Sequence, residues 1–193
     1  MADLTLRERK QQRARQQIID AAFALFAERG FANVSVTDIA ERAEVGRSTF
    51  FRYFGDKQEV VFSDEADLLE AIDAAPPGEA APDLTTALVQ VCELTEQLAG
   101  LVVGDPRRWP ERERLLAANP ELEDRANRKL QRVADGVQGV LLSRGTDAEV
   151  AVLAAELAVA CFRAGRRTAG EDADAVMPAM RRAVTLLLGD RIS

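Results

Sequence analysis

The segment from Asn33 to Lys57, NVSVTDIAERAEVGRSTFFRYFGDK, constrains the fold more than any other part of this chain of 193 residues. Ser35 is a favoured helix N-cap, and Asp38 follows three residues later, where a capping box has its acid. The sequence therefore predicts a short helix that begins near Val36. Its apolar residues are spaced three and four apart and are Val36, Ile39, Ala40 and Ala43.

A second short helix is predicted after a tight turn at Glu44-Val45-Gly46. Phe50 and Phe54 lie four residues apart and are expected to anchor this helix inward. Two such helices are typical of a helix-turn-helix, whose second helix enters the major groove of DNA with its N-terminus first. The alternative is that both helices are only part of an all-helical core.

The helix-turn-helix hypothesis assigns DNA contacts to particular residues. From these two helices they are Thr37, Arg47, Ser48, Thr49, Phe51, Arg52 and Tyr53. Arg47, Ser48 and Thr49 are expected deepest in the groove, and Arg52 and Tyr53 nearer the DNA backbone. Asp56 is expected to cap a third helix. Lys57 falls in the first turn of that helix, where its ammonium and the free backbone amides could hold one phosphate together.

A basic cluster precedes the two helices. It consists of Arg7, Arg9, Lys10, Arg13 and Arg15, with Glu8 as the only acid between them. Such a cluster suits the phosphate backbone beside a groove, although an ordinary solvated helix start is the alternative. It belongs to a helix predicted from about Leu6 to Arg29 and closed by Gly30. The residues of this helix expected to face inward are Ile18, Ile19, Ala22, Phe23, Leu25 and Phe26.

The first 60 or so residues resemble the N-terminal signature of the TetR-like transcriptional regulators. The matching residues are Phe23, Phe26, Gly30, Val36, Ile39, Ala40, Ala43, Val45, Phe51, Phe54 and Lys57. Three positions depart in detail: Glu44 stands where the family usually has glycine, Gly46 where it usually has a serine cap, and Phe51 where it usually has tyrosine. The run Phe-Phe-Arg-Tyr-Phe also resembles the subgroup typified by the mycofactocin-type regulators.

Charge is divided unequally along the chain. Residues 1–60 hold ten Lys or Arg against nine Asp or Glu, whereas the remainder holds 15 against 23. Because the acidic remainder repels a polyanion, only one oriented patch would attract DNA. We predict a helix-turn-helix DNA-binding domain at 1–60 and a helical effector-binding and dimerisation domain at 61–193.

The sequence predicts an all-α fold of about nine helices, with no convincing strand. The helix from Lys57 is expected to continue to Ile72, before the Pro-Pro loop at 74–78. Later helices are expected at about 83–98, 111–118 and 120–144, then from about 147 through Phe162, and last at 172–188. Thr146 and Glu149 read as the capping box that opens the helix before the last.

The stretch from Val150 to Phe162 is apolar nearly all the way round, so it must be covered on more than one face. A second copy of the chain could cover it, and the resemblance also implies a homodimer through the last two helices. Burial within a monomer is the alternative. Two recognition helices related by a two-fold axis would read a palindromic, double-stranded DNA operator.

Enzyme chemistry finds little support. The chain has no histidine, which removes the commonest general base and transition-metal ligand, and motifs for phosphate loops or nucleophile elbows do not occur. We predict no catalytic residue, no metal and no cofactor. Cys92 and Cys161 are expected to be reduced packing residues, with a redox switch as the alternative. With no signal peptide and no apolar stretch of ~20 residues, a cytoplasmic protein that does not enter a membrane is expected.

The resemblance implies that the second domain binds a small-molecule effector. Candidate walls of its cavity are Leu88, Val91, Thr95, Leu98, Trp109 and Phe162, with Arg163 for an anionic group; each could also be plain core. We therefore predict a dimeric transcriptional regulator, a repressor released by its ligand. The rival hypothesis is a helical small-molecule-binding protein or enzyme whose helix-turn-helix-like segment is only scaffold.

Overall fold

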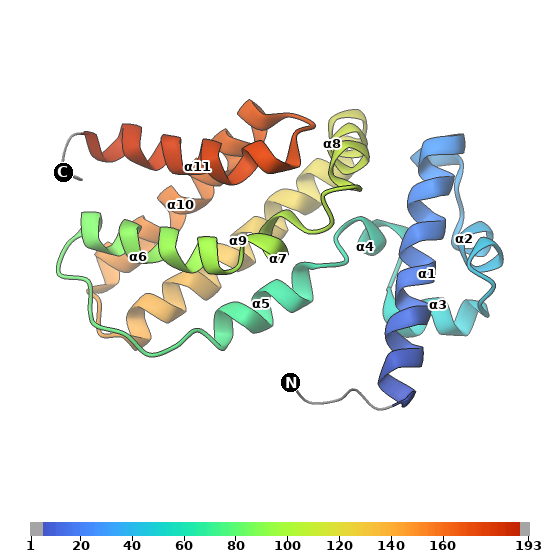
Figure 1. Ribbon diagram of the computed structural model, residues 1–193, viewed down its shortest axis with the longest axis horizontal. Helices are drawn as coiled ribbons and strands as arrows, with labels where there is room; N and C mark the ends of the chain where they lie inside the picture. The colour runs from blue at the N-terminus through green and yellow to red at the C-terminus, as the bar shows by residue number, and fades with distance from the viewer. Residues whose placement is uncertain (1–5, 190–193) are drawn as a thin grey trace. The chain divides into compact units, whose positions relative to one another are not determined.

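The computed structural model describes residues 6–189, and every regular element in that range is helical. The chain divides between Ser63 and Asp64 into two compact units. The helices of the first unit are α1 (Leu6–Arg29), the 3₁₀ turn η1 (Phe31–Asn33), α2 (Val36–Arg42), α3 (Arg47–Tyr53) and α4 (Lys57–Val61). Those of the second are α5 (Glu65–Asp73), α6 (Leu84–Gln97), α7 (Ala99–Val103), α8 (Trp109–Ala118), α9 (Pro120–Ser143), α10 (Ala148–Ala169) and α11 (Ala173–Leu188) (Figure 1). The predicted all-α class is confirmed.

The first unit is built on an aromatic core. Seven of the eight phenylalanines lie in residues 1–63, and all but Phe51 of these are buried. The inward residues predicted for α1, from Ile18 to Phe26, are all buried as expected. Gly30 ends α1 with φ 76°, a backbone conformation that favours glycine, and its N–H donates to the Phe26 carbonyl at 2.9 Å.

The structure has two helices, α4 and α5, in the region after Lys57 where the sequence predicted one. The single helix expected from Lys57 to Ile72 is wrong, because the chain turns at residues 62–64 between α4 and α5. Phe62 and Ser63 are buried there, and the Ser63 carbonyl accepts a hydrogen bond from the Arg15 guanidinium. The burial of Phe62 and Ser63 and the hydrogen bond from Arg15 to the Ser63 carbonyl accompany the interruption of the helix. The apolar periodicity of the sequence does not show this interruption.

Two further corrections concern helix boundaries. The stretch between α6 and α8 contains the short helix α7, which the sequence pattern did not predict. The capping box predicted from Thr146 and Glu149 is wrong: the N-cap of α10 is Asp147, whose carboxylate accepts from the N–H groups of Glu149 and Val150. The Thr146 hydroxyl instead accepts from the backbone N–H of Ala81 at 2.9 Å.

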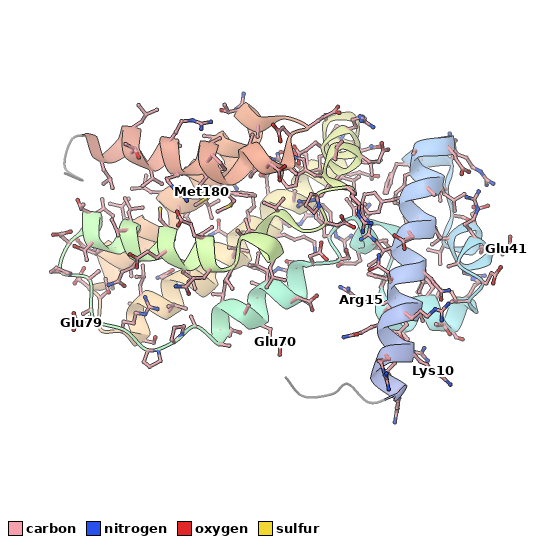
Figure 2. All side chains as sticks on the ribbon, viewed as in Figure 1. Lys10, Arg15, Glu41, Glu70, Glu79 and Met180 are labelled. Atoms are coloured by element: carbon pink, nitrogen blue, oxygen red, sulfur yellow. The ribbon has the colours of Figure 1, made fainter. Side chains whose placement is uncertain are left out.

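The second unit is organised around α10, which packs against α6, α9 and α11. Half of its eight buried residues are alanines and one is a glycine, so neighbouring helices approach closely. The closest approach is at Gly165, where an added Cβ would lie 2.6 Å from the backbone nitrogen of Met180 on α11. Figure 2 shows Met180 within this helical layer, while Glu70 and Glu79 project from the surface of the same unit.

Polar contacts fix the ends of helices in the second unit. Trp109 is buried at the start of α8, and its indole N–H donates to the Gly170 carbonyl at the end of α10, at 2.9 Å. Glu65, in the first turn of α5, forms ion pairs with Lys129 and Arg132 of α9. Lys129 is buried, so the Glu65 carboxylate stabilises its charge where little water reaches it.

The two cysteines lie in the second unit, one half-buried and one buried. Burial raises the pKa of the Cys92 thiol to about 11 and also raises the pKa of Cys161. Both thiols are therefore protonated, and weakly nucleophilic, near neutral pH. None of the helices within residues 6–189 has both the length and the apolarity to cross a membrane.

The Gly165 contact predicts a large effect of one methyl group. We expect Gly165→Ala to lower the free energy of unfolding by about 1–3 kcal/mol, since the new Cβ meets backbone that cannot move aside freely. Gly139→Ala in α9 is the matched control, because its Cβ would meet nothing within 4 Å, and alanine should stabilise the helix by about 0.5–1 kcal/mol. Urea unfolding followed by circular dichroism measures both; equal effects would contradict the close approach.

Candidate nucleic-acid interface

Hydrogen bonds close both ends of α2, and those at its end shape the turn that leads to α3. At its start, Ser35 and Asp38 form the predicted capping box, and the hydrogen bonds from Ser35 lower the pKa of the Asp38 carboxyl. At its end, the N–H of Val45 donates to the Ala40 carbonyl at 2.9 Å, and the N–H of Glu44 to the Glu41 carbonyl at 3.1 Å. This is a Schellman motif, in which Glu44 takes the left-handed position with φ 55°.

Two buried phenylalanines orient α3. Phe50 is fully buried and Phe54 nearly so, with ring centroids 5.8 Å apart, as their spacing predicted. The opposite side of the helix is left outward: Arg47, Ser48, Phe51 and Arg52 are exposed, and Thr49 and Tyr53 are half-buried. Thr37, in the first turn of α2, is also half-buried. All of the residues of α2 and α3 predicted to contact DNA are therefore at least partly accessible.

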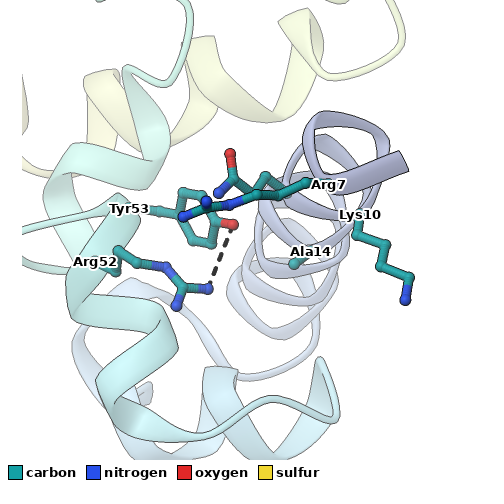
Figure 3. Close-up of a pocket in the computed structure, with 6 residues that line it drawn as sticks. Arg7, Lys10, Ala14, Arg52 and Tyr53 are labelled. Atoms are coloured by element: carbon teal, nitrogen blue, oxygen red, sulfur yellow. Dashed lines mark hydrogen bonds between the residues drawn. The ribbon is translucent and has the colours of Figure 1, made fainter. Parts of the chain in front are cut away.

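A groove lies between the start of α1 and the end of α3 (Figure 3). It is open, has a volume of about 500 Å³ and is lined by Arg7, Lys10, Gln11, Ala14, Arg52 and Tyr53. The Arg52 guanidinium lies 5.0 Å from the centroid of the Tyr53 ring, and its Nη2 is 3.5 Å from the Tyr53 hydroxyl oxygen. Three cations and a hydroxyl line this groove with no carboxylate among them, so it suits an anion such as a phosphate.

Gln11 and Ala14 were missed as lining residues. Helical spacing could have found them, because Arg7, Lys10, Gln11 and Ala14 follow the i, i+3, i+4, i+7 pattern of one helix face. The exposed Arg9 and Arg13 belong to the same arm but do not line the groove. The arm therefore presents its charges on more than one side of α1.

Arg15 contributes differently from the rest of the basic arm. Its side chain is half-buried, donates to the Ser63 carbonyl and lies 5.8 Å from the Phe54 ring centroid. These contacts fasten α1 to the end of α3 and to the end of the unit. A contact of Arg15 with the DNA backbone stays a prediction.

Lys57 also has partners inside the first unit. Its ammonium donates to the carbonyls of Phe31, at 2.7 Å, and Val34, at 2.8 Å, and lies 4.4 Å from the Phe31 ring centroid. An ammonium has three N–H donors, so one is left for a phosphate. The phosphate contact stays a prediction, and Lys57 also links α4 to the segment before α2.

Two other arginines of the first unit pair with carboxylates. Arg29 lies 3.3 Å from Asp38, and Arg42 makes a bidentate pair with Glu28, at 2.8 and 3.0 Å. The hydrogen bonds with Arg42 lower the pKa of the Glu28 carboxyl. Since these cations are neutralised locally, the positive field of the unit is concentrated at α3 and at the start of α1.

The residues predicted to wall an effector cavity lie in the second unit. Leu88, Val91, Trp109 and Phe162 belong to its packed core, and the half-buried Leu98 packs against that core. The Thr95 hydroxyl donates to the Val91 carbonyl at 2.7 Å, within its own helix. Arg163 is half-buried on α10. Their role in ligand binding stays a prediction.

A group of charged residues inside the second unit was not predicted. Arg166 of α10 donates to Glu123 of α9 at 2.7 Å and lies 3.8 Å from Glu113 of α8. Burial raises the pKa of Glu113, and it lowers the pKa of Arg112, whose guanidinium lies 5.4 Å from the Trp109 ring centroid. Helical spacing from Trp109 could have placed Glu113 on the buried side of α8. Among the residues described, no cluster of three or more acidic or cysteine side chains is arranged to hold a metal ion.

Comparison with known proteins finds a family match for most of the first unit. Residues 18–63, from the core of α1 to the end of the first unit, match the family described as bacterial regulatory proteins, tetR family. This segment carries the N-terminal signature of the tetR family. The resemblance found in the first 60 residues is thereby confirmed.

Two curated sequence relatives each match only a part of the chain. The HTH-type transcriptional regulator TcmR of Streptomyces glaucescens is 43% identical over 79 residues, which cover 38% of this chain and 34% of TcmR. A Mycobacterium tuberculosis protein named for the regulation of mycofactocin biosynthesis, MftR, is 47% identical over 47 residues, 24% of each chain. The chain thus spans about a third or less of the length of these curated relatives, and the mycofactocin subgroup stays a prediction.

Solved structures extend the likeness in fold to most of the chain. The complex of the repressor SmeT of Stenotrophomonas maltophilia with triclosan superposes with a TM-score of 0.53, covering 91% of this chain and 90% of SmeT. The two sequences are 17% identical, so this likeness concerns the fold alone. It confirms an N-terminal helix-turn-helix followed by a helical C-terminal part.

Because the backbone of Glu44 is left-handed, we expect glycine at this position to increase stability. We expect Glu44→Gly to raise the free energy of unfolding of the first unit by roughly 1 kcal/mol, because a Cβ is unfavourable at φ 55°. Glu41→Gly, three residues earlier and inside α2, makes the same chemical change at a helical position and should cost about 1 kcal/mol. Amide hydrogen exchange over residues 36–54 reports both; a loss in Glu44→Gly would contradict the strain.

The contacts of Lys57 predict a structural cost when its charge is removed. We expect Lys57→Met to lower the stability of the first unit by about 1–3 kcal/mol, since two carbonyls lose their donor. Lys10→Met, at an exposed site on α1, should change stability by less than about 0.5 kcal/mol. Hydrogen exchange over residues 18–60 measures the difference, and equal protection in both variants would show that the Lys57 contacts stabilise little.

Proposed function

We propose that this protein is a sequence-specific DNA-binding transcriptional regulator that acts as a homodimer on a palindromic operator. The observation that carries the proposal is the surface of the first unit, where the outward side of α3 lies in the segment matched to the family and a basic groove lies beside it. Arg47, Ser48 and Thr49 supply the groups that read base edges. Arg7, Lys10 and Arg52 supply the charge that positions the protein on phosphates.

Charge supports an oriented encounter with DNA. The chain carries a formal net charge of −7, yet residues 1–60 are slightly basic. An acidic protein binds a polyanion only where its cations are gathered, so the groove and α3 determine which surface meets the duplex. DNA binding also places the protein where the chromosome is, which agrees with the expected cytoplasmic location.

Exposed apolar side chains support a homodimer through α10 and α11. Val152 and Leu153 of α10 are exposed although the other side of this helix is buried in the unit. On α11, Leu186 is 84% exposed and Leu187 is also exposed. Apolar side chains on two neighbouring helices favour burial against a second copy, with the two-fold symmetry that a palindrome requires.

Regulation by a small molecule is the further part of the proposal. SmeT, which shares the fold, is solved in complex with triclosan, and this supports a small-molecule effector for this chain as well. A ligand that prefers one conformation of the dimer would shift the population away from the DNA-competent state, as expected of a ligand-released repressor. We infer no catalytic role for any residue of the chain.

Two substitutions, each of which removes one positive charge, distinguish contacts that read bases from contacts that position the protein on phosphates. An operator is first selected from random duplexes, and fluorescence anisotropy then gives affinities at two salt concentrations. We expect Arg47→Ala to change the preferred base pair at one position of each half-site, with a loss of about 1–3 kcal/mol on the original site. Lys10→Gln should weaken all duplexes alike and reduce the salt slope by about one unit per bound protomer.

The proposal has a clear contrary outcome. Selection that enriches no duplex, with weak binding that depends on salt alone, would favour the rival hypothesis of a scaffold without DNA function. A changed base preference in Lys10→Gln, with none in Arg47→Ala, would instead show that α3 is misplaced in the groove.

A further inference from the structure

Phe51 is an apolar side chain in a polar setting. Among the side chains described between residues 7 and 63, it is the one large hydrophobic group that lies exposed, with half of its surface open to solvent. Its neighbours on the outward side of α3, Ser48 and Arg52, are polar. An exposed aromatic ring amid polar groups marks a surface that is covered when a partner binds.

The Phe51 ring is held in a defined direction. It packs edge-to-face on Phe50, with centroids 5.6 Å apart and planes at 85°, and Phe50 is fully buried. The ring therefore rests on the core of the unit and presents its free side outward. A preorganised ring loses little conformational freedom when it is covered.

Helical spacing relates Phe51 to the residues proposed to read bases. Phe51 follows Arg47 by four residues and Ser48 by three, so all three lie on one side of α3. A helix that enters the major groove with Arg47 and Ser48 leading would bring Phe51 against the same wall of the groove. The ring lacks a hydroxyl, so it cannot donate a hydrogen bond to a phosphate.

The chemistry of the major groove then identifies the occupant. Base edges there present hydrogen-bond donors and acceptors, and the apolar group among them is the C5 methyl of thymine. We propose that Phe51 determines specificity by packing on a thymine methyl group in each half-site, next to the base pair read by Arg47 or Ser48. This inference rests on the proposed DNA-binding function and names a contact within it.

Deoxyuridine offers a test that removes the methyl group alone. Each thymine of the selected operator is replaced in turn, symmetrically in both half-sites, and affinity is measured for the wild-type protein, Phe51→Ala and Phe51→Tyr. For the wild type we expect one position at which replacement weakens binding about fourfold per half-site, the equivalent of one buried methyl group. Phe51→Tyr keeps the ring and should keep this sensitivity.

Phe51→Ala should lose the sensitivity at that position and no other, so the two changes are coupled in a double-mutant cycle. Circular dichroism of both variants confirms that they fold. Wild-type binding that is specific yet indifferent to deoxyuridine at every position would overturn the inference and leave the proposed function standing. So would a deoxyuridine penalty that is the same in Phe51→Ala. Failure of the wild type to select any duplex would overturn the proposed function itself.

Discussion

The burial of Phe50 and Phe54 is the constraint on which the candidate interface depends. These two rings fix one side of α3 in the core of the first unit, and every outward residue of that helix takes its direction from them. Lys57 and Arg15 reinforce the same core from its edges, each with a cation near a phenylalanine ring and a hydrogen bond to a backbone carbonyl. A small domain with so few residues gains rigidity from such aromatic packing, which a base-reading surface requires.

The two units differ in the physical means by which they are built. The first combines large aromatic side chains with a basic surface, whereas the second packs alanine-rich α10 closely against its neighbours and is acidic overall. The close approach at Gly165 leaves little room for adjustment between α10 and α11. Their outward apolar residues therefore lie on a rigid surface, where we propose that a second copy binds. The first helix of this unit, α5, is tied to α9 through Glu65.

Local patterns predicted much of this structure. The Ser35 cap, the Phe50 and Phe54 anchors and the ends of most helices follow from rules that act over four residues. Contacts between residues far apart in the chain could not be predicted in this way. The hydrogen bond from Arg15 to the Ser63 carbonyl spans 48 residues. Those from Lys57 to the carbonyls of Phe31 and Val34 span 26 and 23, and the one from the Ala81 N–H to the Thr146 hydroxyl spans 65. These contacts explain the broken helix after Val61 and the second role of Lys57.

We propose that α3 occupies the major groove of DNA in two symmetry-related copies. Guanine N7 lies in that groove, so its methylation by dimethyl sulfate reports occupancy directly. On a duplex saturated with protein, we expect two symmetric groups of protected guanines, about one helical turn or a multiple of it apart. Saturated binding that leaves every guanine N7 as reactive as in free DNA would contradict it.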